Sequence, residues 1–170
     1  VALATPPGIG AIAVIRVSGK NLKPLFKQIT DKKTDPVPRY VYYETISDSE
    51  KNQIDNCLIT YFPGPKSFTG EDVIEISCHG GEAVKKSIVN AALDSGVRLA
   101  EPGEFSFRSF LNGKIDLLQA EAVSALISSK SSLSKEISLT HLEGKVSKML
   151  QNIKIKMINL LSIIENELNF

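Results

Sequence analysis

The feature that most constrains this chain is a long helical stripe of apolar residues toward its C-terminus. The stripe recurs at steps of three and four and consists of Leu139, Leu142, Val146, Met149, Ile153, Met157, Leu160, Ile164 and Leu168. No glycine or proline follows Gly144. This spacing predicts a helix bundle or a coiled coil. An apolar face of this length cannot stay solvated, so we expect further helices or a second copy of the chain to cover it.

The part of the chain before this helical region mixes strand and helix signals. Short apolar or alternating runs predict strands at residues 11–17, 40–46, 57–62 and 73–78. Helical spacing predicts helices at residues 22–29, between Gly81 and Gly96, and at 105–111. We therefore predict an α+β fold, with a mixed α/β domain over residues 1–116. The long helices of an incomplete helical domain follow over residues 117–170.

Composition narrows the classes of function. The hydrophobic content of 42% is that of a globular protein. The formal net charge of +1 gives no sign of a protein that coats nucleic acid. Cys57 and Cys78 lie in apolar stretches without paired spacing, which favours small core residues in a reducing compartment. No signal peptide and no apolar run of membrane-spanning length is present, so we expect a cytoplasmic protein without a membrane partner.

Several motif searches give negative results. The stretch from Gly80 to Ser87 is close to a phosphate-binding loop, but Lys85 stands where a second glycine is needed, so we interpret it as a helix start with a basic face. We expect no nucleoside triphosphate site in this chain. The two histidines, His79 and His141, lack metal-ligand spacing, and no covalent catalytic pair is visible. His79 remains a candidate hydrogen-bonding group beside Gly80–Gly81.

Three charged residues fall at conspicuous positions. Arg16 lies on the strand that follows the turn ATPPGIG, where it is either a ligand contact or a surface arginine. Glu75 lies in mid-strand, and the alternation places it opposite Ile74 and Ile76, which favours the solvated face. Lys114 lies at the expected junction between the two domains.

Three blocks of sequence together resemble one family. They read ATPPGIGAIAVIRVSG at 4–19, FPGPKSFTGEDVIEISCHGG at 62–81 and PGEFSFRSFLNGKIDLLQAEAVSALI at 102–127. In this order and spacing they strongly resemble the MnmE (TrmE) family of tRNA-modifying GTPases. The resemblance spans essentially the whole chain and implies an N-terminal folate-binding domain similar to aminomethyltransferases. The family's GTPase domain is inserted later in the helical domain, so we expect it to be absent from this chain.

The resemblance also implies a function and partners. Members of this family work with the flavoprotein MnmG (GidA) to add a carboxymethylaminomethyl group to C5 of the wobble uridine of certain tRNAs. The N-terminal domain is expected to form the homodimer and to bind a one-carbon tetrahydrofolate, as the 5-formyl or 5,10-methylene form. GTP, K⁺ and Mg²⁺ belong to the GTPase domain, so we expect no hydrolysis by this chain alone.

Three ligand positions of the family match Arg16, Glu75 and Lys114. A carboxylate such as Glu75 can accept adjacent N–H groups of a pterin, and folate carboxylates suit Arg16 or Lys114. Two positions depart from the family, which usually has an arginine at Ile9 and a basic residue at Glu101.

Two other functions stay open. The first is a non-enzymatic dimerisation and docking scaffold without folate binding, in which Arg16 and Glu75 form an internal ion pair. The second is a self-sufficient folate aminomethyltransferase, which the lack of a catalytic constellation disfavours.

Overall fold

The computed structural model describes residues 1–168 and divides the chain into two compact units, Val1–Asn112 and Gly113–Phe170. The division falls shortly before residue 116, where the sequence places the domain boundary. The first unit contains all the strands of the described chain, and the second consists of helices.

The first unit is built on an antiparallel sheet of five strands in the order β1-β2-β5-β4-β3. The strands are β1 Ala2–Leu3, β2 Ile12–Gly19, β3 Val41–Ser47, β4 Gln53–Phe62 and β5 Asp72–His79. The central pairing sets Ile15 opposite Ile76 and Arg16 opposite Glu75. The expected strands are all present, while β1, only two residues long, has no recognisable sequence signal.

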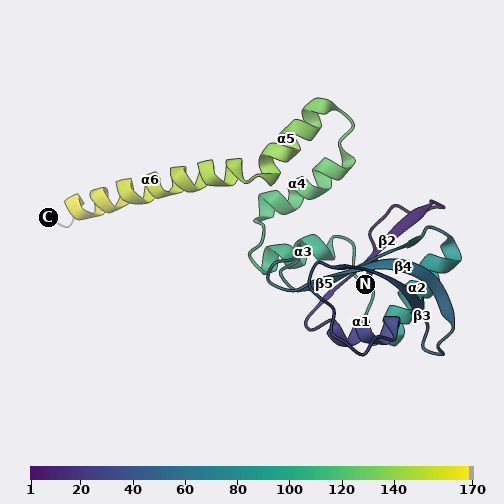
Figure 1. Ribbon diagram of the computed structural model, residues 1–170. Coiled ribbons are helices and arrows are strands. Elements are labelled where there is room, and N and C mark those ends of the chain that lie inside the picture. The colour runs from purple at the N-terminus through teal and green to yellow at the C-terminus, as the bar shows by residue number, and fades with distance from the viewer. Residues whose placement is uncertain (169–170) are drawn as a thin grey trace. The chain divides into compact units, whose positions relative to one another are not determined.

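Two helices, α1 (Lys23–Thr30) and α2 (Glu82–Asp94), pack on one face of this sheet (Figure 1). The core between them and the strands consists of side chains such as Phe26, Ile59 and Ile88, each at most 1% exposed. Burial of such apolar area is the main stabilising contribution to a small domain. Strands and helices in one unit confirm the predicted α+β class.

The alternation expected in β5 is confirmed. Ile74 and Ile76 are fully buried on the helix-covered face, whereas Glu75 and Ser77 lie on the opposite face and are half-buried. Because side chains alternate along a strand, the opposite face is lined by every second residue of each strand.

The short helix α3 (Glu104–Leu111) closes the first unit and ends at Asn112, as its sequence predicts. Side chains of α3 and its cap attach it to the β4–β5 loop. The fully buried Ser109 hydroxyl donates to the Phe68 carbonyl oxygen at 2.8 Å, and the Asn112 amide donates to that of Thr69 at 2.7 Å. Arg108 adds an ion pair to Glu71 at 2.7 Å.

The second unit contains α4 (Leu117–Ser128), α5 (Ser132–Leu142) and α6 (Lys145–Leu168). Asp116 caps α4 by accepting a hydrogen bond from the Gln119 backbone N–H, within a complete capping box. The apolar stripe that begins at Leu139 does not lie on a single helix. Gly144, with φ +71°, separates α5 from α6, so the apolar stripe is divided between two helices.

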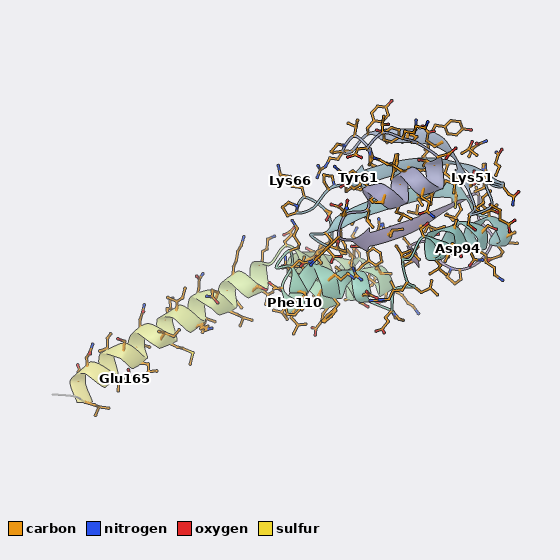
Figure 2. The ribbon with its side chains drawn as sticks, turned by 90° about the horizontal axis from the view of Figure 1, so that it is seen from below. Lys51, Tyr61, Lys66, Asp94, Phe110 and Glu165 are labelled. Carbon is orange, nitrogen blue, oxygen red and sulfur yellow. The ribbon has the colours of Figure 1, made fainter. Side chains whose placement is uncertain are left out.

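The long helix α6 buries none of its side chains among residues 1–168. Figure 2 shows its side chains projecting on all sides, with Glu165 toward its end. The expected cover for its apolar residues is therefore not supplied within the described chain.

Both cysteines are confirmed as core residues rather than bridge partners. Cys57 is 0% and Cys78 is 4% exposed, and both are free thiols. Burial is the main cause that raises the pKa of Cys57 to about 12, and it also raises the pKa of Cys78. Separately, no helix of residues 1–168 is both long and apolar enough to cross a bilayer.

Candidate functional site

Arg16 and Glu75 meet on the open face of the sheet, the face opposite α1 and α2. They are register partners on β2 and β5, and the Arg16 Nε donates to the Glu75 Oε1 at 2.7 Å. Their side chains are 44% and 32% exposed. An ion pair this accessible contributes little to folding stability, because water solvates both charges well. Its polar groups therefore remain available to a ligand at small cost to the fold.

The contact between these two residues leaves much of their hydrogen-bonding capacity unused. Within residues 1–168, the two Nη groups of Arg16 and the Oε2 of Glu75 make no hydrogen bond. A guanidinium presents its donors in a fixed fork that suits carboxylates, and a carboxylate can accept two adjacent N–H groups. The pair therefore leaves donors and an acceptor open to a partner that carries carboxylates or N–H groups.

Apolar side chains lie on the same open face, from the middle of the sheet toward the end where β5 finishes. Ile12, Val41, Tyr43 and Leu58 are 68%, 54%, 71% and 48% exposed. A hollow of about 320 Å³ lies on this face, lined by Ala11, Ile12, Tyr43, Asn56, Leu58, Ser77, Cys78 and His79. Exposed apolar surface of this kind is typical of faces that contact a ligand or another protein.

The loop Ala4–Ala11 is held firmly against the end of β5. Gly10 and Gly80 exchange backbone contacts, with Gly10 N–H donating to the Gly80 carbonyl oxygen at 3.3 Å and Gly80 N–H donating to that of Ala11 at 3.2 Å. Gly8, with φ +116°, has a backbone conformation that favours glycine. This supports the interpretation of the loop as a shaped backbone segment.

Lys85 supplies a further anchor for this loop. Its ammonium, 5% exposed, donates to the Gly8 carbonyl oxygen at 2.6 Å and to the Glu82 carboxylate at 2.7 Å. The expectation that Lys85 belongs to a basic surface face is wrong. It shares the apolar face of α2 with Ile88 and Ala92, and that helical spacing was a signal in the sequence that could have revealed its burial.

The third candidate, Lys114, belongs to the second unit. It follows Gly113, whose φ is +64°, and precedes the α4 cap at Asp116. Lys114 is exposed and engaged in an interaction of its own. The structure thus brings Arg16 and Glu75 together, and it places Lys114 at the start of the helical unit.

No metal centre accompanies these residues. Among residues 1–168, no three side chains of histidine, cysteine, aspartate or glutamate lie close enough together to hold a metal ion. What the first unit offers is an open sheet face with an ion pair, an apolar hollow and a fixed loop.

These features define a class of protein: an α+β binding domain joined to a helical domain. The family model for the N-terminus of the GTP-binding protein TrmE matches residues 1–114, which is all of the first unit and the first two residues of the second. The chain belongs to this TrmE N-terminal family, and the family resemblance predicted from the sequence blocks is confirmed.

Relatives with named functions resemble the whole chain. The tRNA modification GTPase MnmE of Chromobacterium violaceum is 46% identical over 169 residues, covering 99% of this chain and 37% of that protein. The protein of the same name from Aquifex aeolicus is 39% identical over 170 residues, covering 100% of this chain and 38% of that protein. A third, from Fervidobacterium nodosum, is 44% identical over 174 residues. The chain spans somewhat more than a third of the length of such relatives.

Proposed function

We propose that this chain is the folate-binding and dimerising part of a cytoplasmic tRNA-modifying GTPase. In the complete protein it would act with the flavoprotein MnmG on the wobble uridine of certain tRNAs, while GTP, K⁺ and Mg²⁺ would be bound by a GTPase domain outside this chain. The family match and the names of the relatives support the general role. Folate binding rests on the chemistry of the open sheet face.

The observation that carries the folate proposal is the exposed Arg16–Glu75 pair beside an apolar hollow. A reduced folate combines a pterin with N–H donors, an aromatic ring and carboxylates, and this face offers a matching partner for each. When bound, the folate would supply a one-carbon unit. Arg16, Glu75 and Lys114 are the residues we propose to hold it.

The homodimer proposal rests on the same face. Ile12, Tyr43 and Leu58 present exposed apolar surface on a sheet whose other side is fully covered by helices. A second copy that seats its own open face here would bury this surface on both molecules.

Calorimetric titration with 5-formyltetrahydrofolate tests the folate proposal. We expect saturable binding by the wild-type chain and a loss of about 10- to 100-fold in affinity for Arg16→Ala, because each charge-assisted hydrogen bond contributes about 1.5–3 kcal/mol. Lys86→Ala is the matched control, since it removes an exposed cation from α2 on the opposite side of the sheet. Equal affinity in all three proteins would exclude Arg16 from the site.

A specific observation favours the second candidate, the dimerisation scaffold without folate binding. For a scaffold of this kind we expect an internal ion pair between Arg16 and Glu75, and the Arg16 Nε does lie 2.7 Å from the Glu75 Oε1. Light scattering on the same samples separates the two. A folded dimer that shows no heat of folate binding would support the scaffold and overturn the folate proposal.

A further inference from the structure

A histidine–aspartate pair lies at the end of β5, where a carboxylate from the core side of β4 meets a histidine that lines the hollow of the open face. The ring Nδ1 of His79, the last residue of β5, lies 2.8 Å from the Oδ1 of Asp55 on β4. The other oxygen, Oδ2, accepts the backbone N–H of His79 at 2.9 Å. One carboxylate therefore holds both the main chain and the ring of the same histidine, which fixes the ring's orientation.

The carboxylate also fixes which ring nitrogen carries the proton. An ionised carboxylate can only accept hydrogen bonds, so Nδ1 of a neutral His79 must be the donor and Nε2 the acceptor. Within residues 1–168, Nε2 makes no hydrogen bond, and the side chain is 74% exposed while that of Asp55 is only 11% exposed. The free lone pair of Nε2 is thus presented outward, with its partner carboxylate behind it.

Asp55 remains ionised over the physiological range. Burial acts to raise its pKa, but the hydrogen bonds from the backbone and ring of His79 and from the Asn56 N–H outweigh burial, and the pKa is lowered. A fixed negative charge behind the imidazole disfavours an anionic ligand group at Nε2. It favours a ligand group that donates an N–H.

The surroundings of His79 form a prepared site rather than a bare surface. His79 lines the same hollow as Ile12, Tyr43 and Leu58. The adjoining loop is anchored to Gly80 and to the buried ammonium of Lys85, so one wall of this end of the sheet is fixed before any ligand arrives.

His79 and Glu75 lie on the same face of β5, four residues apart. At a rise of about 3.3 Å per residue, their Cα atoms are separated by about 13 Å. Ser77, between them, is one of the residues that line the hollow. A small compound could not contact both residues at once, whereas an elongated ligand with a ring system and polar groups at both ends could.

We propose that His79, oriented by Asp55, is a further ligand-binding residue of the folate site, and that its Nε2 accepts a hydrogen bond from a ligand N–H. This inference rests on the proposed function. The ligand extends from Arg16 and Glu75 across the apolar hollow to His79.

The test uses the chain's two histidines, of which His141 on α5 is the internal control. NMR of the ¹⁵N-labelled chain reports the tautomer of each ring directly. We expect His79 in the Nδ1–H form and expect its ring signals, but not those of His141, to shift as 5-formyltetrahydrofolate is added. A His79 ring protonated on Nε2 in the free chain would overturn the inference.

Calorimetry of two variants supplies the second readout. His79→Gln keeps a hydrogen-bond acceptor and should retain most of the wild-type affinity, while His79→Ala should bind about tenfold more weakly. All these variants keep the backbone N–H that Asp55 accepts.

The outcomes separate this inference from the function on which it rests. Folate binding that Arg16→Ala weakens, combined with unchanged affinity in His79→Ala, would overturn the role of His79 and leave the folate module intact. Absence of folate binding by the folded wild-type chain would overturn both.

Discussion

At the scale of single residues, Gly80 shows how one missing side chain fixes a loop. A Cβ built at this position would collide with the carbonyl oxygen of Gly10 and would lie 2.7 Å from its carbonyl carbon. Both partners are backbone atoms, which cannot rotate away as a side chain can. The close approach of Gly80 to the loop Ala4–Ala11 therefore depends on glycine itself.

We expect Gly80→Ala to lower the free energy of unfolding by about 1–3 kcal/mol, the usual cost of forcing extra volume into a packed region. Gly10→Ala is the matched control on the other side of the same contact. Its Cβ would meet only the Ile12 carbonyl oxygen at 3.5 Å, an ordinary distance. Urea unfolding of both variants measures the difference in stability. Equal midpoints would contradict the prediction, because they would mean that the loop Ala4–Ala11 moves to make room for the added Cβ.

Glu104 carries a second prediction at this scale. Hydrogen bonds from Arg98, then from the Glu101 backbone N–H and from Arg108, lower the pKa of Glu104 well below its usual range. A lowered pKa in the folded chain means that the ionised form stabilises the fold above the pKa of the unfolded chain. That stabilisation is lost as the pH falls through the folded pKa.

We therefore expect the wild-type Tm to fall as the pH is lowered below about 4.5, the range in which an unfolded glutamate takes up its proton. Glu104→Gln should lower the Tm at neutral pH and flatten this acid dependence. The control Glu101→Gln removes an exposed carboxylate but keeps the backbone donor. Parallel acid profiles for wild type and Glu104→Gln would contradict the assignment.

At the scale of elements, α3 is attached to the sheet by polar contacts more than by apolar packing. Phe107 and Leu111 are exposed, while Ser109 is fully buried. Arg108 donates to the Glu71 carboxylate at 2.7 Å and to the Ser18 carbonyl oxygen at 3.3 Å. It therefore joins the helix both to the end of β2 and to the loop before β5.

Removal of this link should loosen α3. We expect Arg108→Met to lower the free energy of unfolding by about 2–3 kcal/mol, since hydrogen bonds to charged groups are lost and Glu71 keeps only the neutral Ser18 hydroxyl as a donor. Arg98→Met should have a smaller effect, because the Arg98 side chain is 65% exposed and that of Arg108 only 26%. Thermal unfolding compares the two, and an equal or larger loss in Arg98→Met would contradict this view of α3.

Apart from the two-residue strand β1, the elements of the first unit were predictable because their residues alternate or repeat in simple ways. The pairing of β2 with β5 was not predictable, because strand register depends on contacts between distant segments. Without that register, the sequence could not decide whether Arg16 is free or paired with Glu75. The separation of α5 from α6 was missed because the step from Leu142 to Val146 keeps helical spacing across Gly144. Asp55 was missed although it alternates with Cys57 and Ile59 on the core side of β4.

At the scale of the whole chain, the two units differ in how their backbone is protected. The strand β5 lies in the middle of the sheet with buried neighbours on both sides, whereas α6 buries no side chain among residues 1–168. A helix without tertiary packing is only marginally stable in water.

Hydrogen exchange should report this difference. We expect the amides of α6 to exchange close to the rate of an unstructured peptide, and those of β5 to exchange only through global unfolding. The measurement is made at low chain concentration, where self-association is minimal. Strong protection of α6 under these conditions would mean that its apolar stripe is covered.

The burial of both native thiols has a practical consequence. Maleimide dyes react with exposed thiolates, and the raised pKa values and near-zero exposure of Cys57 and Cys78 keep both unreactive in the folded chain. A cysteine introduced at the exposed Lys51 or Glu165, both labelled in Figure 2, would then be the only reactive thiol among the described residues, and neither native cysteine would need to be replaced. With a fluorescent donor and an acceptor at these two positions, the efficiency of energy transfer would report changes in the distance between the first unit and the last helix.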